Sequence, residues 1–450
     1  MASSTTALSI DIFSCLCDHG RMEREDLIEA RGHLEAFLKP LLPLLGRSER
    51  RRWGAFYVQG LLLETGRKTA AGLSARLGGN VQAVQQFVNQ SPWDWLAVRR
   101  ALAQEMVRQA ACRGAWILDD TGFPKKGTHS VGVARQYSGT LGKIGNCQVT
   151  VSLNYATADG CFPVDFQLYL PQSWTEDQPR RQKAGVPADV TFQTKWQIGL
   201  GMLDAAQNWG LPQAVVVADA AYGIATEFRR GLQERGRHYV LGITADLTVW
   251  TEAVTAKTPT YRGVGRPPHR DRTLPKPRKV AEVARDLPAT AWQEVSWREG
   301  TKGPLCGRFA AIRVQPAIGY FNGKATEPVV WLLIEWPRPA PEPIKYWFSN
   351  LPESTDLQEL VYWAKIRWYV EQNYQQLKDE LGLDHFEGRS WNGWHRHVTL
   401  TMMAFAFLVL EGFRAKKNFW VDLAPGQAGT TAYDFPAAWV LPELRSPIHN

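Results

Sequence analysis

The sequence has few cysteines, and none has the paired spacing of a disulfide framework or a zinc ribbon. The six cysteines among 450 residues stand at positions 15, 17, 112, 147, 161 and 306, without a CxxC pair. The first twenty residues lack the basic start and apolar run of a signal peptide. No later stretch reaches about 18 uncharged apolar residues, the length that spans a bilayer. We therefore expect an intracellular protein with free thiols and no membrane segment.

Acidic residues are fewer than basic ones, although the difference is small. Asp and Glu number 44 against 52 Lys and Arg, which gives a formal net charge of +8. This excess favours a nucleic-acid partner, but an indifferent basic surface gives the same count. With 44% apolar and 21% charged residues, the composition is that of a globular protein. The length exceeds one core, so we expect two or three structural units.

Residues 1–105 are predicted to form a helical N-terminal domain. Apolar residues recur at helical spacing from Leu27 to Leu38 and again from Phe56 to Leu63. The stretch KTAAGLSARLGGNVQAVQQFVNQS, from Lys68, is a short helix, a glycine break and a second helix, which is typical of a helix-turn-helix. Any helical hairpin needs a similar break, so the pattern favours DNA binding without excluding a plain helical unit.

Strand patterns begin near residue 115 and alternate with helices further on. The apolar runs WIL (116–118), SVGVARQY, CQVTVSLNY and CFPVDFQLYL are followed by a helix at 195–209, the strand AVVVAD at 214–219, a helix near 225–235 and the strand HYVLGI. This order predicts a mixed α/β sheet. We divide the rest of the chain into a core in two parts, 106–245 and 336–424, a β-rich insertion at 246–335 and a tail at 425–450.

Three acidic positions lie where a sheet or a helix would present them. WILDDTGFPKKG is interpreted as a strand that ends in Asp119 and Asp120, and VVVADAAYG as a second strand that ends in Asp219. The stretch from Leu357 to Leu381 is predicted to be one helix, stopped by Gly382, with Arg367, Glu371 and Lys378 on one face.

Carboxylates from separate elements suit phosphodiester chemistry. Two divalent ions held by carboxylates can stabilise both the attacking and the leaving oxygen of a phosphoryl transfer, and Mg²⁺ prefers oxygen ligands. Each motif alone has a simpler explanation, because an Asp at a strand end is usually a turn or cap residue. An Arg and a Glu four apart are usually a solvated pair. The combination, in this order along a mixed sheet, favours catalysis.

These motifs resemble the bacterial insertion-sequence 701-type transposases of the DDE superfamily. The resemblance covers residues 115–410, through WILDDTGFPKKGTHSVGVARQYSGTLGKIGNCQVTVSL, VVADAAYG and IRWYVEQNYQQLKDELGLDHFEGRSWNGWHRH. It implies an RNase H-like mixed sheet flanked by helices, and two Mg²⁺ or Mn²⁺ ions held by Asp119 or Asp120, Asp219 and Glu371. We lean to Asp119, which directly follows the apolar run, and keep both. Where related helices carry a tyrosine, this sequence has Ala364, with Trp363 beside it.

The resemblance also implies partners. We expect double-stranded DNA, as transposon inverted repeats and as target, a homodimer that pairs two ends, and a place in the bacterial cytosol. Predicted DNA contacts are Lys125 and Lys126 after the first acids, Arg367 and Lys378 beside Glu371, and the arginines of a Pro-rich basic segment, Arg262, Arg266, Arg270 and Arg272. That segment could instead be a solvated loop, and Lys125 and Lys126 part of a plain turn.

The predicted function is metal-dependent cleavage of transposon ends and strand transfer into target DNA. Three alternatives stay open: a DNA-binding protein descended from a transposase but without catalysis, a nuclease on the same fold that cuts without joining, and an unrelated hydrolase of small phosphoesters. Trp292 and Trp297, in the insertion, could stack on a displaced base, but packing within the fold explains them better.

Overall fold

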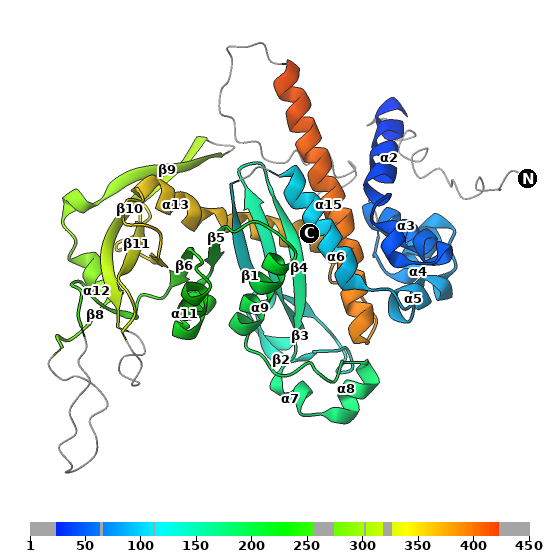
Figure 1. Cartoon of the computed structure of the whole chain (residues 1–450), viewed down its shortest axis with the longest axis horizontal. Coiled ribbons are helices and arrows are strands. Elements are labelled where there is room, and N and C mark those ends of the chain that lie inside the picture. The colour runs from blue at the N-terminus through cyan, green and yellow to red at the C-terminus, as the bar shows by residue number, and fades with distance from the viewer. Residues whose placement is uncertain are drawn as a thin grey trace, which may run out of the picture.

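A computed structural model describes residues 24–422, apart from 64–65, 111–112, 256–273, 301–302 and 318–325. Figure 1 shows N-terminal helices at one end, a sheet through the middle, and the strands of the insertion at the other end. The predicted contacts Arg262, Arg266, Arg270 and Arg272 and the predicted tail at 425–450 lie outside the described residues.

The N-terminal part is helical, as predicted. Thr69 caps one helix by accepting a hydrogen bond from the Gly72 backbone, and Asn80 caps the next through the Ala83 backbone. Gly78, with a φ of +69°, ends the first of these two helices in the left-handed region that favours glycine. The predicted helical hairpin is therefore present. The helices are α2 (Arg24–Leu38), η1 (Leu42–Leu45), α3 (Ser48–Leu62), α4 (Ala70–Leu77), α5 (Val81–Asn89) and α6 (Trp95–Gln109).

The twelve strands that the structure describes form one mixed sheet, which confirms the predicted fold class. β1 pairs antiparallel with β3 on one side and parallel with β5 on the other. The order is β2-β3-β1-β5-β6-β12-β11-β10-β7-β8, with β4 on β3 and β9 on β10. The core strands are β1 (Gly114–Pro124), β2 (Ala134–Ser138), β3 (Lys143–Thr157), β4 (Cys161–Tyr169), β5 (Val215–Ala218) and β6 (Tyr239–Ile243).

The predicted insertion continues the same sheet. Its strands and helices are β7 (Thr248–Trp250), β8 (Arg278–Lys279), α12 (Val280–Arg285), η3 (Ala289–Ala291), β9 (Gln293–Gly300), β10 (Gly303–Pro316) and β11 (Val330–Trp336). β12 (Lys345–Ser349) then joins this half of the sheet to β6. The domain boundaries themselves stay a prediction, since one buried hydrophobic cluster runs from Leu34 to Phe413.

Helices cover both faces of the central strands. Leu118 faces α9, because a Cβ added to Gly199 of that helix would lie 3.1 Å from the Leu118 side chain. The remaining helical elements are η2 (Gly139–Leu141), α7 (Gln172–Thr175), α8 (Gln178–Ala184), α9 (Lys195–Asn208), α10 (Ala220–Gly223), α11 (Thr226–Glu234), α13 (Leu357–Ile366), α14 (Trp368–Gln375), the π-helix η5 (Gln376–Glu380) and α15 (Trp391–Asp422).

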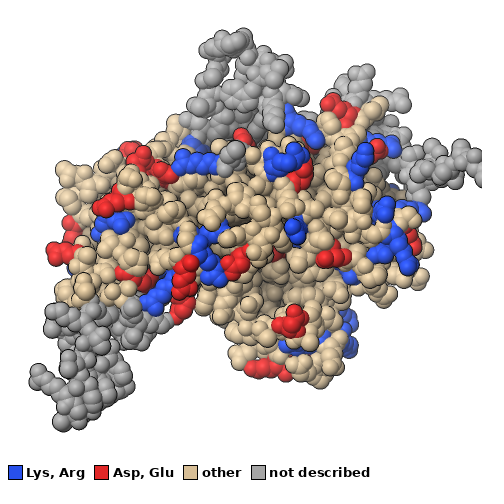
Figure 2. All heavy atoms as spheres, in the orientation of Figure 1, with Lys and Arg blue, Asp and Glu red and all other residues tan. Residues whose placement is uncertain are grey.

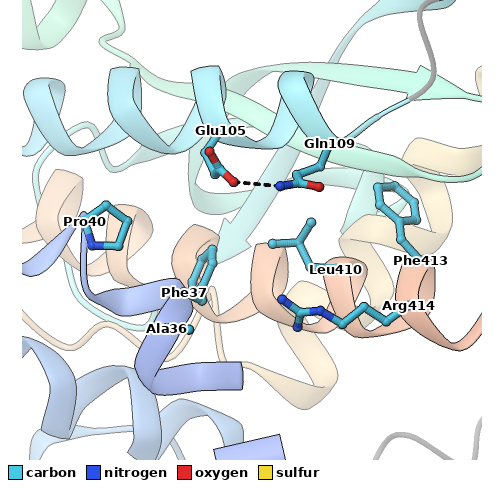
Figure 3. A pocket seen from close by; sticks show the side chains of 8 residues that line it. All are labelled: Ala36, Phe37, Pro40, Glu105, Gln109, Leu410, Phe413 and Arg414. Carbon is cyan, nitrogen blue, oxygen red and sulfur yellow. Dashed lines mark hydrogen bonds between the residues drawn. The ribbon is translucent and has the colours of Figure 1, made fainter. Parts of the chain in front are cut away.

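The long helix α15 packs against the N-terminal helices and also against β4. By length and composition its segment Trp391–Arg414 could cross a membrane, but 83% of the apolar window is buried inside the fold, as in a core helix. Where α15 meets α2 and α6, a small cavity of about 160 Å³ remains. Figure 3 shows Phe37 and Leu410 lining it below Glu105 and Gln109.

Candidate active site

Asp119 and Asp120 lie in the middle of a strand and not at its end. β1 continues to Pro124, paired with β3 throughout, so the predicted strand end at Asp119 and Asp120 is wrong. The polar residues from Asp119 onward are tolerated because β3 supplies their backbone hydrogen bonds and helices cover them. Successive side chains of a strand point to opposite faces. Asp120 therefore shares the α9 face with Leu118, and Asp119 points to the other face.

Asp219 follows β5 directly, at the carboxyl end of a parallel strand as predicted. Leu118 is the partner of Ala218 in the register between β1 and β5, so Asp219 continues the strand beside Asp119. Its carboxylate accepts a hydrogen bond from the Ala221 backbone at 2.9 Å and caps α10. The cap fixes the direction of the side chain.

The predicted continuous helix from Leu357 to Leu381 is divided into α13, α14 and η5, with the first break at Arg367. Arg367 joins two carboxylates across this break. Its Nη1 lies 2.6 Å from Asp119 Oδ2 and its Nη2 lies 2.8 Å from Glu371 Oε1. One guanidinium thus brings together an acid from the sheet and an acid from the helix, as a planar fork of donors can.

Burial sets the proton affinity of the two aspartates. The pKa of Asp119 is raised to about 7, first by burial and then by the charges of Asp219 and Asp120, although Arg367 opposes the rise. The pKa of Asp219 is also raised by burial, again against the effect of Arg367. Glu371 stays largely in solvent, with 58% of its side chain exposed. For both aspartates, the positive charge of Arg367 is therefore smaller in effect than the cost of burying the carboxylate.

The structure separates the two candidates for the first acid. Asp120 Oδ2 lies 2.7 Å from the ammonium of Lys195, at the start of α9. Asp119, by contrast, shares Arg367 with Glu371. Both aspartates lie close enough to Asp219 for their charges to interact with it. Lys195 was not a candidate from the sequence, because neither a motif nor its spacing relates it to Asp120.

Buried hydroxyl groups line the same region and were also missed. Tyr374, one helical turn after Glu371, contacts Ser152 through their hydroxyl oxygens at 2.5 Å, and Asn154 donates to Ser152 at 2.8 Å. Ser152 is the β3 partner of Asp119 in the register. Tyr222 is fully buried and its hydroxyl has no hydrogen-bond partner in the described part of the chain. The spacing of Tyr374 from Glu371 was the available signal.

The predicted lysine contacts are placed differently from one another. Lys378 donates to the Gly122 carbonyl at 3.0 Å and to the Thr140 hydroxyl at 2.9 Å. Lys125 donates to the carbonyls of Asp384 and Phe386. Each ammonium has three protons, and these two hydrogen bonds use two of them. Lys126 is exposed, and the DNA-binding role of all three remains a prediction.

Comparisons with known proteins identify the family of the chain. The family model for the DDE superfamily endonuclease matches residues 40–304, which is more than half of the chain. The chain belongs to the DDE superfamily of endonucleases. The matched range includes both candidates for the first acid and Asp219, and it ends before Glu371. A mixed sheet flanked by helices is consistent with the RNase H-like fold that the resemblance implied.

A curated relative points to the same group. A protein of Microchaete diplosiphon, described as a probable transposase for insertion sequence element IS701, is 30% identical over 192 residues. That alignment covers 42% of this DDE endonuclease and 47% of the relative, so the match spans about half the length of each protein.

The insertion of the DDE endonuclease holds the helix that precedes Glu371. Lys365 of α13 pairs with Glu335 of β11 at 2.6 Å, and its ammonium lies 4.5 Å from the centre of the Trp297 ring. Arg298 lies 3.4 Å from the centre of the Trp368 ring. Trp292 is buried and packs edge to face on Trp336. Packing within the fold therefore accounts for both tryptophans that could have stacked on a base.

Among the residues that the structure describes, no three His, Cys, Asp or Glu side chains are close enough together to hold a metal ion. The donor set nevertheless fits a divalent cation. Asp119 and Glu371 already bind one shared cation, the Arg367 guanidinium, through hard carboxylate oxygens. Burial raises the pKa of Asp119 and of Asp219 despite the opposing charge of Arg367, so a further cation would favour their ionised forms.

Proposed function

We propose that this protein is a transposase, which cuts the ends of a mobile DNA element and joins them to target DNA. The observation that carries the proposal is the convergence of Asp119 and Glu371 on Arg367, with Asp219 directly after the neighbouring strand β5. Membership in the DDE endonuclease family supports a nuclease, and the similarity to a probable IS701 transposase supports transposition.

Asp119, Asp219 and Glu371 would hold two divalent ions, Mg²⁺ or Mn²⁺, which supply Lewis-acid stabilisation of the charge that develops on the phosphate. The chain's own groups would do the rest. Ala221 orients Asp219 through its backbone N–H, and Arg367 holds Glu371 toward the sheet. The side chain of Asp120 faces α9 and pairs with Lys195, so we assign it to positioning β1 against α9.

We infer that DNA lies across the face of the sheet that carries Asp119, beside the carboxyl end of β5 that Asp219 follows. The predicted helix-turn-helix pair, α4 and α5, and the basic start of α3 would then grip the flanking duplex. Figure 2 shows basic side chains gathered over the N-terminal helices on the face that it draws. At the start of α3, Arg47, Arg51 and Arg52 are exposed. Two ends must be paired for transposition, so we propose at least a transient homodimer on DNA.

The test is cleavage of DNA that carries the inverted repeats flanking the gene. We expect Asp219→Asn and Glu371→Gln to lose Mg²⁺-dependent nicking and to retain gel-shift affinity. Asp379→Asn is the matched control, since Asp379 is exposed and lies on the same run of helix. Full nicking by Asp219→Asn or Glu371→Gln would refute the assignment.

The same assay separates the two aspartates and the two enzyme classes. Asp119→Asn is expected to abolish nicking, and Asp120→Asn to leave measurable nicking. Incubation of precleaved ends with a plasmid then distinguishes a transposase, which yields joined products, from a nuclease that only cuts. A protein that binds the repeats without nicking them would be the DNA-binding descendant.

A further inference from the structure

Two large apolar side chains lie exposed next to each other on the hairpin formed by β2 and β3. Tyr137 is 63% exposed and Ile144 is 60% exposed. They are direct partners in the antiparallel register, so their side chains stand on the same face of the hairpin. Single exposed apolar residues are common on protein surfaces, but a directly paired aromatic and branched residue is an apolar spot.

This apolar pair lies on the face of the sheet that carries Asp119. In the register, Asp119 is the partner of Ser152 and Tyr137 is the partner of Ile144. Ser152 and Ile144 are an even number of residues apart on β3, so their side chains point to the same face of the sheet. Neither register contains a shift between these positions. Eight residues of strand span about 26 Å, which is the length of roughly eight base pairs. DNA held at the carboxylates can therefore reach the pair.

The charge around the pair is suited to DNA. Residues 121–158 contain no Asp or Glu, whereas Lys125, Lys126, Arg135 and Lys143 all lie within them. Arg135 and Lys143 are exposed, and Arg135 points to the same face as Tyr137, two residues along the strand. Phosphates repel carboxylates, so the lack of acidic residues in this stretch favours DNA over a protein as the partner.

The hairpin is fixed relative to the active site. Lys378, at the end of the helix that carries Glu371, donates to the Thr140 hydroxyl in the turn between β2 and β3. It also donates to the Gly122 carbonyl in β1, and Thr140 donates to the same carbonyl at 3.2 Å. The turn therefore cannot move away from the catalytic helix without breaking these bonds. A prearranged apolar surface loses little conformational freedom when it binds.

We propose that Tyr137 and Ile144 contact an unstacked base of the DNA that is bound for cleavage. The aromatic ring would stack on the base and Ile144 would support it, while Arg135 and Lys143 contact the flanking phosphates. This inference rests on the proposed function, because it places the contact on the DNA that the carboxylates cut.

The experiment uses inverted-repeat duplexes with 2-aminopurine placed singly at positions four to twelve base pairs from the cleavage site. We expect a fluorescence change on binding near position eight, absent with Tyr137→Ala and retained with Tyr137→Phe. Tyr137→Ala should bind about tenfold more weakly, in the range for loss of one stacked base. Ile344→Ala is the matched control, since Ile344 is another exposed apolar residue at 54% exposure.

The outcomes separate this inference from the proposed function. If the wild-type protein nicks the repeats but Tyr137→Ala binds and reports fluorescence unchanged, this inference alone is overturned. If Tyr137→Ala alters the mass of the protein in solution and leaves the DNA affinity per protomer intact, the pair joins two copies and the inference is also overturned. Failure to bind or nick any repeat would instead count against the proposed function. If Arg135→Ala makes the salt dependence of DNA affinity shallower by about one phosphate contact, that result would support the inference about the hairpin.

Discussion

Lys365 offers the sharpest test of how the insertion holds α13, the helix that precedes Glu371. Its ammonium pairs with Glu335 at 2.6 Å and lies within 5.6 Å of the ring centres of Trp297, Phe309 and Trp347. Only 14% of the Lys365 side chain and 6% of the Glu335 side chain are exposed. Burial of this kind lowers the pKa of Lys365. The pair is therefore an ion pair in an apolar setting, where removal of one partner leaves the other uncompensated.

The expected magnitude follows from this burial. Lys365→Met should cost about 3–5 kcal/mol of unfolding free energy, because it leaves the Glu335 carboxylate buried and unpaired. The lost contacts with the aromatic rings lie within that range. The double variant Lys365→Met/Glu335→Gln should recover most of the loss, since no uncompensated charge remains. The interaction energy between the two positions is then roughly 2–3 kcal/mol.

The assay is urea denaturation followed by tryptophan fluorescence and circular dichroism, with midpoints compared at a common slope. Glu294→Gln is the control, because Glu294 forms an exposed pair with Arg338, and such pairs contribute less than about 1 kcal/mol. If Lys365→Met lost no more stability than this control, or if the two single losses simply added, the reasoning about the buried pair would be refuted.

Three further predictions concern stability. Burial raises the pKa of Asp119 to about 7 from a usual 3.8, so the folded protein binds this proton more tightly than the unfolded chain. The stabilisation that this proton gives to the folded protein is complete below pH 4 and is lost as the pH rises through 7. In EDTA, the thermal midpoint should fall more steeply between pH 4 and 7 for the wild type than for Asp119→Asn, and equal slopes would contradict the assignment. Gly223→Ala should lower the thermal midpoint or prevent folding, because its Cβ would lie 1.9 Å from the Gly242 carbonyl oxygen. Gly201→Ala is the control and should be tolerated, because its Cβ would lie in open space on α9. Equal thermal midpoints for Gly223→Ala and Gly201→Ala would contradict this prediction. Arg99→Met should cost about 3–5 kcal/mol in urea denaturation, since Arg99 is fully buried and pairs with Asp165 at 2.7 Å. A loss below about 1 kcal/mol would show that the pair is dispensable.

Local pattern was sufficient where one element decides the outcome. The helical N-terminal part, the apolar strands of the core and the position of Asp219 after β5 all follow from the periodicity of apolar residues. Gly382 ends the helical run as predicted, with a φ of +67°. His395 and His397 are fully buried, which makes them structural.

The sequence could not determine how far β1 extends. Polar side chains after Leu118 predicted a strand end, because a polar residue in a buried strand is unfavourable without partners. The partners come from β3, which pairs with β1 as far as Pro124, and from Lys195 and Arg367. Those residues are distant in the chain, so their effect is absent from any local window.

By itself the sequence determined which acids were available and on which kinds of element they lie, because strand and helix periodicity are local properties. Only the tertiary structure decided that Asp119 faces α14 and Asp120 faces α9, because neighbouring residues of a strand point apart and the helices that cover each face come from elsewhere in the chain. Packing likewise directed Lys378 to the hairpin turn and placed Lys365 among aromatic rings. Long-range contacts, whose sequence separation hides them, thus decided the site.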